Sequence, residues 1–324
     1  MSTTPQPPDL AAVRAAAARI SAVVERTPII RSDTLDALSG ARLFFKCEHL
    51  QKTGAFKARG ASNAVFGLAD DVARRGVATH SSGNHGAALA WAARLRGIPA
   101  HVVVPANANR AKRANIERYG ARVVLCEPTL AARESTLAAV LAETGANAVP
   151  PYDDARVIAG QGTSVLELLQ DTDGLDDILT PVGGGGLLSG AAIAAHGMDA
   201  TIRVYGAEPL GADDAARSLA AGERLPQTDP RTMADGLRTS LGELNFAILR
   251  QEVHGIITVT EAQIAGATRL LWEICKQLVE PSSAVVLAAV LAQPELFRGR
   301  RVGLVLSGGN VDLDAPLPWS EITP

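Results

Sequence analysis

The residue with the clearest chemical potential in this chain is Lys57, in the segment Gln-Lys-Thr-Gly-Ala-Phe-Lys-Ala-Arg-Gly at residues 51–60. Its neighbours Phe56 and Ala58 can partly desolvate the amine. Desolvation lowers the pKa of a lysine and makes the amine a nucleophile toward carbonyl groups, which is how a Schiff base forms. The alternative is an ordinary solvated helix lysine, and three glycine-rich segments elsewhere in the chain favour the reactive interpretation.

The first of these segments is a run of four glycines between a predicted buried strand and a predicted helix: Gly183, Gly184, Gly185 and Gly186. Backbone N–H groups in such a turn can approach a bound anion closely, and the start of the helix adds its dipole. The run matches neither the Gly-x-Gly-x-x-Gly spacing of dinucleotide sites nor a Walker loop. It predicts a phosphate site, with a flexible turn as the alternative.

Two more polar turns follow predicted strands, Ser-Ser-Gly-Asn-His-Gly at residues 81–86 and Ser-Gly-Gly-Asn at residues 307–310. The amide of Asn84 could hydrogen-bond a phenolic or carbonyl oxygen, while the serines and backbone N–H groups could bind a carboxylate. Taken alone, the first turn is also typical of a helix N-cap. The Ser307 hydroxyl could face a ring nitrogen, and a hydroxyl partner would leave a pyridine unprotonated.

Strands and helices must position these turns. Sequence patterns typical of strands and of helices alternate along the chain at βαβ spacing. Predicted strands cover residues 42–47, 77–80, 100–104, 123–126, 147–149, 178–182, 203–207, 256–259 and 302–306. Predicted helices cover residues 9–24, 60–68, 87–95, 111–119, 131–143, 158–169, 187–196, 261–278 and 282–291, and residues 208–242 form a less regular polar stretch. The pattern predicts an α/β fold with parallel sheets covered by helices on both faces. The site should lie where strand ends and helix starts converge.

Composition narrows the classes of partner. The chain has 324 residues, 47% of them hydrophobic, which predicts a globular protein with two lobes. A formal charge of −3 provides no basic field for nucleic acid or a membrane surface, so the expected partners are small molecules. The N-terminus does not resemble a signal peptide, and the longest apolar run, residues 284–292, is too short to span a bilayer, so a cytoplasmic location is expected. Three widely spaced cysteines predict neither disulfides nor zinc.

Together, the four motifs resemble those of the fold-type-II pyridoxal-phosphate enzymes, in particular the branch that contains serine racemase and serine/threonine dehydratase. The motifs are Lys-Thr-Gly-x-Phe-Lys-x-Arg-Gly, Ser-Ser-Gly-Asn-His-Gly, Pro-Val-Gly-Gly-Gly-Gly and Ser-Gly-Gly-Asn, and the resemblance extends from Thr27 to Asp312. It implies a tryptophan-synthase-β-like fold of two doubly wound open-sheet domains. Residues 1–76 and 151–324 would form a large cofactor-anchoring domain, and residues 77–150 a small mobile domain that closes over the substrate. A homodimer is also expected.

The resemblance implies a role for each motif residue. Lys57 would form the Schiff base with pyridoxal 5′-phosphate, and Phe56 would pack near its ring. Asn84 would hold the 3′-oxygen of the cofactor, Gly183–Gly186 the phosphate, and Ser307 the pyridine nitrogen. The residues expected to bind the substrate are Ser81, Ser82, Asn84, His85 and, near the mouth of the site, Arg133.

The resemblance also implies a site for a divalent cation. The carboxylates of Glu208 and Asp214 and the carbonyl of Ala212 would supply hard oxygen ligands suited to Mg²⁺ or Ca²⁺. A solvated acidic turn is the alternative.

Two positions give opposite indications about the reaction. Tyr152 stands where the racemase has an asparagine, and the segment Tyr-Asp-Asp resembles the dehydratases. Ser82, in contrast, resembles the racemase, because many threonine dehydratases have alanine at that position. We expect a dehydratase that converts serine, threonine or 3-hydroxyaspartate to a 2-oxo or imino acid. Lys57 would be the general base, Ser82 or the cofactor phosphate would assist the leaving hydroxyl, and Ser82 would be the second acid in a racemase side reaction. The alternatives are a serine or aspartate-type racemase and a non-catalytic binding protein on the same scaffold.

Overall fold

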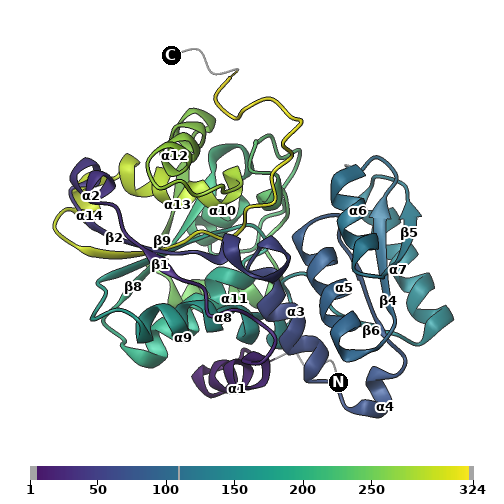
Figure 1. Ribbon diagram of the computed structural model, residues 1–324. Helices are drawn as coiled ribbons and strands as arrows, with labels where there is room; N and C mark the ends of the chain where they lie inside the picture. Colours follow the sequence, from purple (N-terminus) through teal and green to yellow (C-terminus); the bar gives the residue numbers. More distant parts are fainter. Residues whose placement is uncertain (1–5, 109, 321–324) are drawn as a thin grey trace.

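The computed structural model describes residues 6–108 and 110–320, which contain two sheets (Figure 1). The six-stranded sheet has the order β1-β2-β10-β7-β8-β9 and the four-stranded sheet the order β5-β4-β3-β6. The strands are β1 (Ile29–Ile30), β2 (Arg42–Lys46), β3 (Val77–His80), β4 (Ala100–Pro105), β5 (Arg122–Cys126), β6 (Asn147–Ala148), β7 (Asp177–Pro181), β8 (Arg203–Pro209), β9 (Gly255–Val259) and β10 (Arg301–Val305). Strand β1 pairs antiparallel with β2, and the other pairs are parallel. The predicted α/β fold with parallel sheets is confirmed.

Helices pack on both faces of the larger sheet. Buried side chains of successive residues in β7 point to opposite faces. Ile178 belongs to a core with α8 (Ala155–Gln170) and α9 (Gly186–Met198), and Leu179 to a core with α12 (Glu261–Glu273) and α13 (Pro281–Ala292). The helices are α1 (Leu10–Ile20), α2 (Asp33–Ser39), α3 (Lys57–Phe66), α4 (Asp70–Ala73), α5 (Asn84–Arg96), α6 (Arg110–Arg118), α7 (Leu130–Thr144), α8 (Ala155–Gln170), α9 (Gly186–Met198), α10 (Asp214–Ala221), α11 (Glu243–Glu252), α12 (Glu261–Glu273), α13 (Pro281–Ala292) and α14 (Pro294–Phe297). In the described ranges, no helix has the length and apolar composition needed to cross a bilayer.

In each of the two sheets, the order in which the chain adds strands reverses direction once. From β7 the chain runs outward to β8 and β9 and then returns to place β10 on the other side of β7. From β3 it runs to β4 and β5 and returns to place β6 beside β3. At such a switch point, the loops after two neighbouring strands turn to opposite sides of the sheet and leave a crevice between them. Ligands of open α/β sheets usually bind in this crevice.

Several sequence predictions differ from the structure at element level. The prediction missed α2 and α11, and it treated residues 208–242 as irregular although they include α10. Helix α2 spans only seven residues, too few for a periodic pattern, between the N-cap Ser32 and Gly40 at φ 71°. The division of the chain into a large domain and a mobile domain of residues 77–150 stays a prediction.

Candidate active site

A cavity of ≈ 460 Å³ lies at the carboxyl ends of both sheets. It brings together the loops after β3, β6, β7 and β10 and the start of α3, as expected from the two switch points. All the residues predicted to bind cofactor or substrate line it: Phe56, Lys57, Ser81, Ser82, Asn84, His85, Arg133, Gly183, Gly184, Gly185, Gly186 and Ser307. The structure therefore places four motifs that are far apart in sequence around one space.

Lys57 is the first residue of α3. Its Nζ donates a hydrogen bond to the carbonyl of Pro151 (2.7 Å) and lies 4.9 Å from the centre of the Phe56 ring. Burial lowers the pKa of Lys57 to about 8, although the carboxylate of Glu280 opposes the shift. The neutral amine is thus accessible near neutral pH, as a nucleophile or a general base requires.

A buried ion-pair network anchors the helix that begins at Lys57. Arg59 is fully buried, and its Nε and Nη1 lie 2.7 Å from carboxylate oxygens of Glu48 and Glu167. The backbone N–H of Phe56 also donates to the carbonyl of Ser307 (2.9 Å). These contacts fix the lysine turn to β10 and α8, so the amine is held against a rigid framework.

The glycine loop after β7 has the features of an anion cradle. Helix α9 begins at Gly186, and no side chain caps its N-terminus. Gly185 has φ 92°, a conformation that favours glycine, and a Cβ added there would lie 2.7 Å from Leu241. The loop therefore exposes backbone N–H groups at a helix N-terminus that lines the cavity, as a phosphate requires.

The turn after β3 presents polar groups from a second helix N-terminus. Helix α5 has Gly83 as its N-cap with no side-chain cap, so neither Ser81 nor Ser82 acts as one. The amide of Asn84 donates to both carboxylate oxygens of Glu280 (3.1 and 3.3 Å) and accepts from Asn310 (2.9 Å). The orientation of Asn84 is thus set by residues on two other loops.

The charge state of His85 limits what it can do in the cavity. Its Nε2 lies 2.9 Å from the carbonyl of Val149, and its Nδ1 has no partner. Burial and, to a lesser degree, the charge of Lys57 lower the pKa of His85 to about 3. The imidazole is therefore neutral and cannot attract a substrate carboxylate as a cation.

Ser307 lies in a polar pocket formed by hydroxyl and backbone groups. Its Oγ lies 3.1 Å from Oγ of Ser283, which in turn accepts from the N–H of Gly308 (2.7 Å). Ser307 is 4% exposed and lines the cavity. A buried hydroxyl of this kind suits an unprotonated ring nitrogen.

Sequence reasoning missed several residues that line the cavity. The segment around residues 235–239 supplies Leu237 and Thr239, and the start of α13 supplies Glu280 and Ser282. Thr239 Oγ1 lies 3.0 Å from the hydroxyl of Tyr152. The segment has no hydrophobic periodicity, and only its folding over the glycine loop brings it to the site.

Glu208, Ala212 and Asp214 lie together outside this cavity, between the end of β8 and the start of α10. Both carboxylates are fully buried, and Asp214 Oδ1 has no hydrogen-bond partner. Burial is the main cause that raises the pKa of Glu208 to about 9 and that of Asp214 to about 6. In residues 6–108 and 110–320, no group of three or more His, Cys, Asp or Glu side chains could hold a metal, so a cation here would need the Ala212 carbonyl as well.

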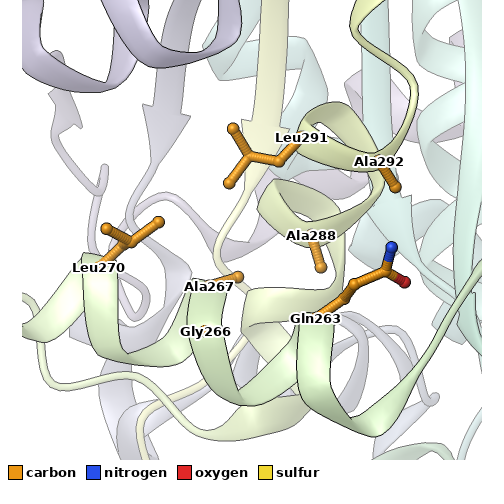
Figure 2. A pocket seen from close by; sticks show the side chains of 7 residues that line it. All are labelled: Gln263, Gly266, Ala267, Leu270, Ala288, Leu291 and Ala292. Atoms are coloured by element: carbon orange, nitrogen blue, oxygen red, sulfur yellow. The ribbon is translucent and has the colours of Figure 1, made fainter. Parts of the chain in front are cut away.

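A second cavity, of ≈ 210 Å³, lies between α12 and α13 (Figure 2). Its lining consists of Gln263, Gly266, Ala267, Leu270, Ala288, Leu291 and Ala292. It contains no charged side chain, so it offers no acid, base or nucleophile.

Comparisons with known proteins point to one family. Residues 20–308 match the family described as pyridoxal-phosphate dependent enzyme. The chain is 51% identical over 306 residues to the beta-hydroxyaspartate dehydratase of Paracoccus denitrificans, in a match that covers 94% of this chain and 97% of that protein. It is similar to the structure of maize serine racemase (TM-score 0.93, 45% identity, 95% of each chain). It is also similar to the structure of a T.th. threonine deaminase (TM-score 0.90, 46% identity, 95% of this chain and 100% of that chain).

Proposed function

Because the chain belongs to the family of pyridoxal-phosphate-dependent enzymes, we propose that it is a dehydratase that converts a small β-hydroxy amino acid to a 2-oxo acid and ammonia. The observation that carries the proposal is the cavity in which the amine of Lys57, with its lowered pKa, meets the glycine loop and the turn after β3. Candidate substrates are serine, threonine and 3-hydroxyaspartate. The similarity to the beta-hydroxyaspartate dehydratase of Paracoccus denitrificans supports 3-hydroxyaspartate.

The residues around the cavity fit the cofactor. Gly183–Gly186 at the uncapped start of α9 would hold the phosphate, Ser307 the pyridine nitrogen, and Asn84 the 3′-oxygen. Phe56 would pack near the ring, and Lys57 would hold the cofactor covalently. When bound, pyridoxal phosphate supplies an electron sink for the negative charge that develops on the substrate Cα.

The protein supplies the proton transfers and the orientation of the substrate. Lys57 accepts the α-proton as the general base. The N–H groups at the uncapped start of α5, with Ser81 and Ser82, bind the substrate carboxylate. His85 contributes as a neutral imidazole, and Arg133 contributes positive charge at the mouth of the cavity.

A racemase is the second candidate, because Ser82 lines the same cavity and makes no cap to α5. In that reaction Ser82 would return a proton to the face of Cα away from Lys57. A panel of serine, threonine and 3-hydroxyaspartate stereoisomers, assayed for 2-oxo acid and for the opposite enantiomer, tests both functions. The proposal fails if no stereoisomer yields a 2-oxo acid.

Ser82→Ala should separate the two reactions. We expect racemisation to be lost, while dehydration of the enantiomer whose α-proton faces Lys57 keeps most of its rate, because elimination needs no donor on the second face. Rates with both serine enantiomers and the thermal midpoint would be measured. Equal losses in both reactions would rule out a two-base role for Ser82.

We also propose that Glu208, Asp214 and the Ala212 carbonyl bind Mg²⁺ or Ca²⁺, since two buried carboxyl groups lie together there and Asp214 Oδ1 has no hydrogen-bond partner. Asp214 Oδ2 accepts from the N–H of Leu241 (2.7 Å), in the chain segment that continues from Thr239 at the cavity. We further propose that the protein forms a homodimer and is located in the cytoplasm.

Chelation should therefore lower the thermal stability of the enzyme. A cation present at 100 times its dissociation constant stabilises the folded state by about 2.7 kcal/mol, and EDTA removes that contribution. Glu208→Gln with Asp214→Asn should abolish the response to EDTA. Asp213→Asn, which changes the partly exposed neighbouring carboxylate that pairs with Arg217, should keep it. An unchanged EDTA response in the double variant would contradict the site.

A further inference from the structure

The loop between β6 and α8 is held at several residues from Pro151 to Asp154. The carbonyl of Pro151 accepts from Lys57, Asp153 accepts from N–H groups at the start of α11 (3.0 Å from Leu244), and Asp154 caps α8 (2.8 Å from the N–H of Arg156). Tyr152, between these anchors, therefore has little freedom to move.

The side chain of Tyr152 packs against the glycine loop. A Cβ added at Gly184 would lie 2.2 Å from Cγ of the ring, so the ring and the loop are in direct contact. The phenolic hydroxyl lies 3.0 Å from Oγ1 of Thr239, and both residues line the cavity that contains Lys57. A hydroxyl pair is thus fixed in the wall beside the proposed phosphate cradle.

Loss of a β-hydroxyl needs a proton donor, because hydroxide is a poor leaving group. Lys57 is the base that takes the α-proton, and His85 is neutral with Nε2 engaged to Val149. Glu280 accepts from Asn84 through both of its oxygens, so its carboxyl group is engaged with the turn after β3. Among the protein hydroxyls of the described lining, Ser82 included, the phenol of Tyr152, with an ordinary pKa of about 10, is the strongest acid. It would take the role that the family resemblance leaves to Ser82 or to the cofactor phosphate.

The environment keeps that phenol protonated. Burial raises the pKa of Tyr152, and the bond to Thr239 only partly opposes this shift. The hydroxyl can therefore act as a donor over the whole neutral range.

We propose that the Tyr152 hydroxyl, positioned by Thr239, protonates the departing β-hydroxyl of the substrate. The inference rests on the proposed dehydratase function. The α-proton goes to the Lys57 amine, the Cα–H electron pair forms the Cα–Cβ double bond, and the Cβ–O bond breaks. The departing oxygen keeps that bond's electron pair and takes the Tyr152 proton to leave as water. The phenolate then regains a proton from the Lys57 ammonium through water, which restores both groups.

Tyr152→Phe tests the step because it keeps the ring on Gly184 and removes only the hydroxyl. The substrates are the β-hydroxy amino acid that the wild type dehydrates best and 3-chloroalanine, whose chloride leaves without a proton. We expect kcat/KM for water elimination to fall about 100-fold, the scale of general-acid catalysis, and chloride elimination to stay nearly unchanged. Thr239→Val should show the same selectivity to a smaller degree, and Thr239→Ser should restore water elimination.

The controls separate a chemical role from a structural one. Tyr205→Phe makes the same change at a buried tyrosine of the core outside the cavity and should leave both reactions unchanged. Cofactor absorbance and thermal midpoint should match the wild type in Tyr152→Phe. Equal losses with both substrates, or no loss with either, in both Tyr152→Phe and Thr239→Val would overturn the inference. A wild type that releases chloride but no water would refute the dehydratase function itself, and the inference with it.

Discussion

Lys57→Ala should give a colourless protein that folds but has lost at least about 10³-fold in kcat, because it removes both the covalent anchor and the general base. The cavity wall keeps its shape, since the rest of α3 is held by the ion pairs of Arg59. The measurements are the absorbance of the bound cofactor, the rate of 2-oxo acid formation and the thermal midpoint.

Lys52→Ala is the matched control for this experiment. Lys52 lies in the same loop but is exposed and pairs with Glu25 at the surface. We expect it to keep both colour and activity. A Lys57→Ala protein that retained the visible absorbance of the bound cofactor would contradict the assignment of Lys57 as the anchor.

The lowered pKa of Lys57 has a consequence in the apoprotein. The amine must be neutral to attack the cofactor aldehyde, and burial places its pKa at about 8. The rate of cofactor capture should therefore rise with pH up to about 8 and level off above it. A lysine with an ordinary pKa of about 10.4 would instead show a rise that continues beyond pH 10.

Much of the site could be predicted because its residues follow strands. Gly183 follows β7, Ser307 follows β10 and Ser81 follows β3, and each motif marks the point where a parallel strand ends. Strands β7 and β10 end at the carboxyl edge of the larger sheet and β3 at that of the smaller sheet, and residues after all three strands line the cavity, so local sequence patterns were enough to identify them. These predictions succeed because the hydrophobic pattern of a strand and the polar turn after it can be recognised within a few residues.

The contacts that the sequence did not reveal join segments without such a pattern. Thr239 reaches Tyr152 only because residues 232–242 fold across the glycine loop, where Leu237 packs on Gly183. Glu280 precedes the buried helix α13 and is indistinguishable in sequence from a surface N-cap. Long-range packing of irregular backbone sets these positions, and neither hydrophobic period nor turn chemistry encodes it.

The contact between Tyr152 and the glycine loop makes a second large effect testable. In Gly184→Ala the new Cβ would lie 2.2 to 2.4 Å from three atoms of the Tyr152 ring. The ring cannot retreat easily, because Asp153 and Asp154 tie its backbone to two helices. We expect the free energy of unfolding to fall by about 1–3 kcal/mol, the usual cost of overpacking, and cofactor affinity to fall with it.

Gly266→Ala provides the opposite case, since no atom lies within 4 Å of a Cβ added there. In the middle of α12, alanine should stabilise the protein by about 0.5–1 kcal/mol and leave cofactor binding unchanged.

A double-mutant cycle identifies the cause of the loss at Gly184. If the clash with the ring is responsible, Gly184→Ala should cost much less stability and cofactor affinity in a Tyr152→Ala background. The same cost in both backgrounds would mean that the loop itself, rather than its contact with Tyr152, rejects a side chain.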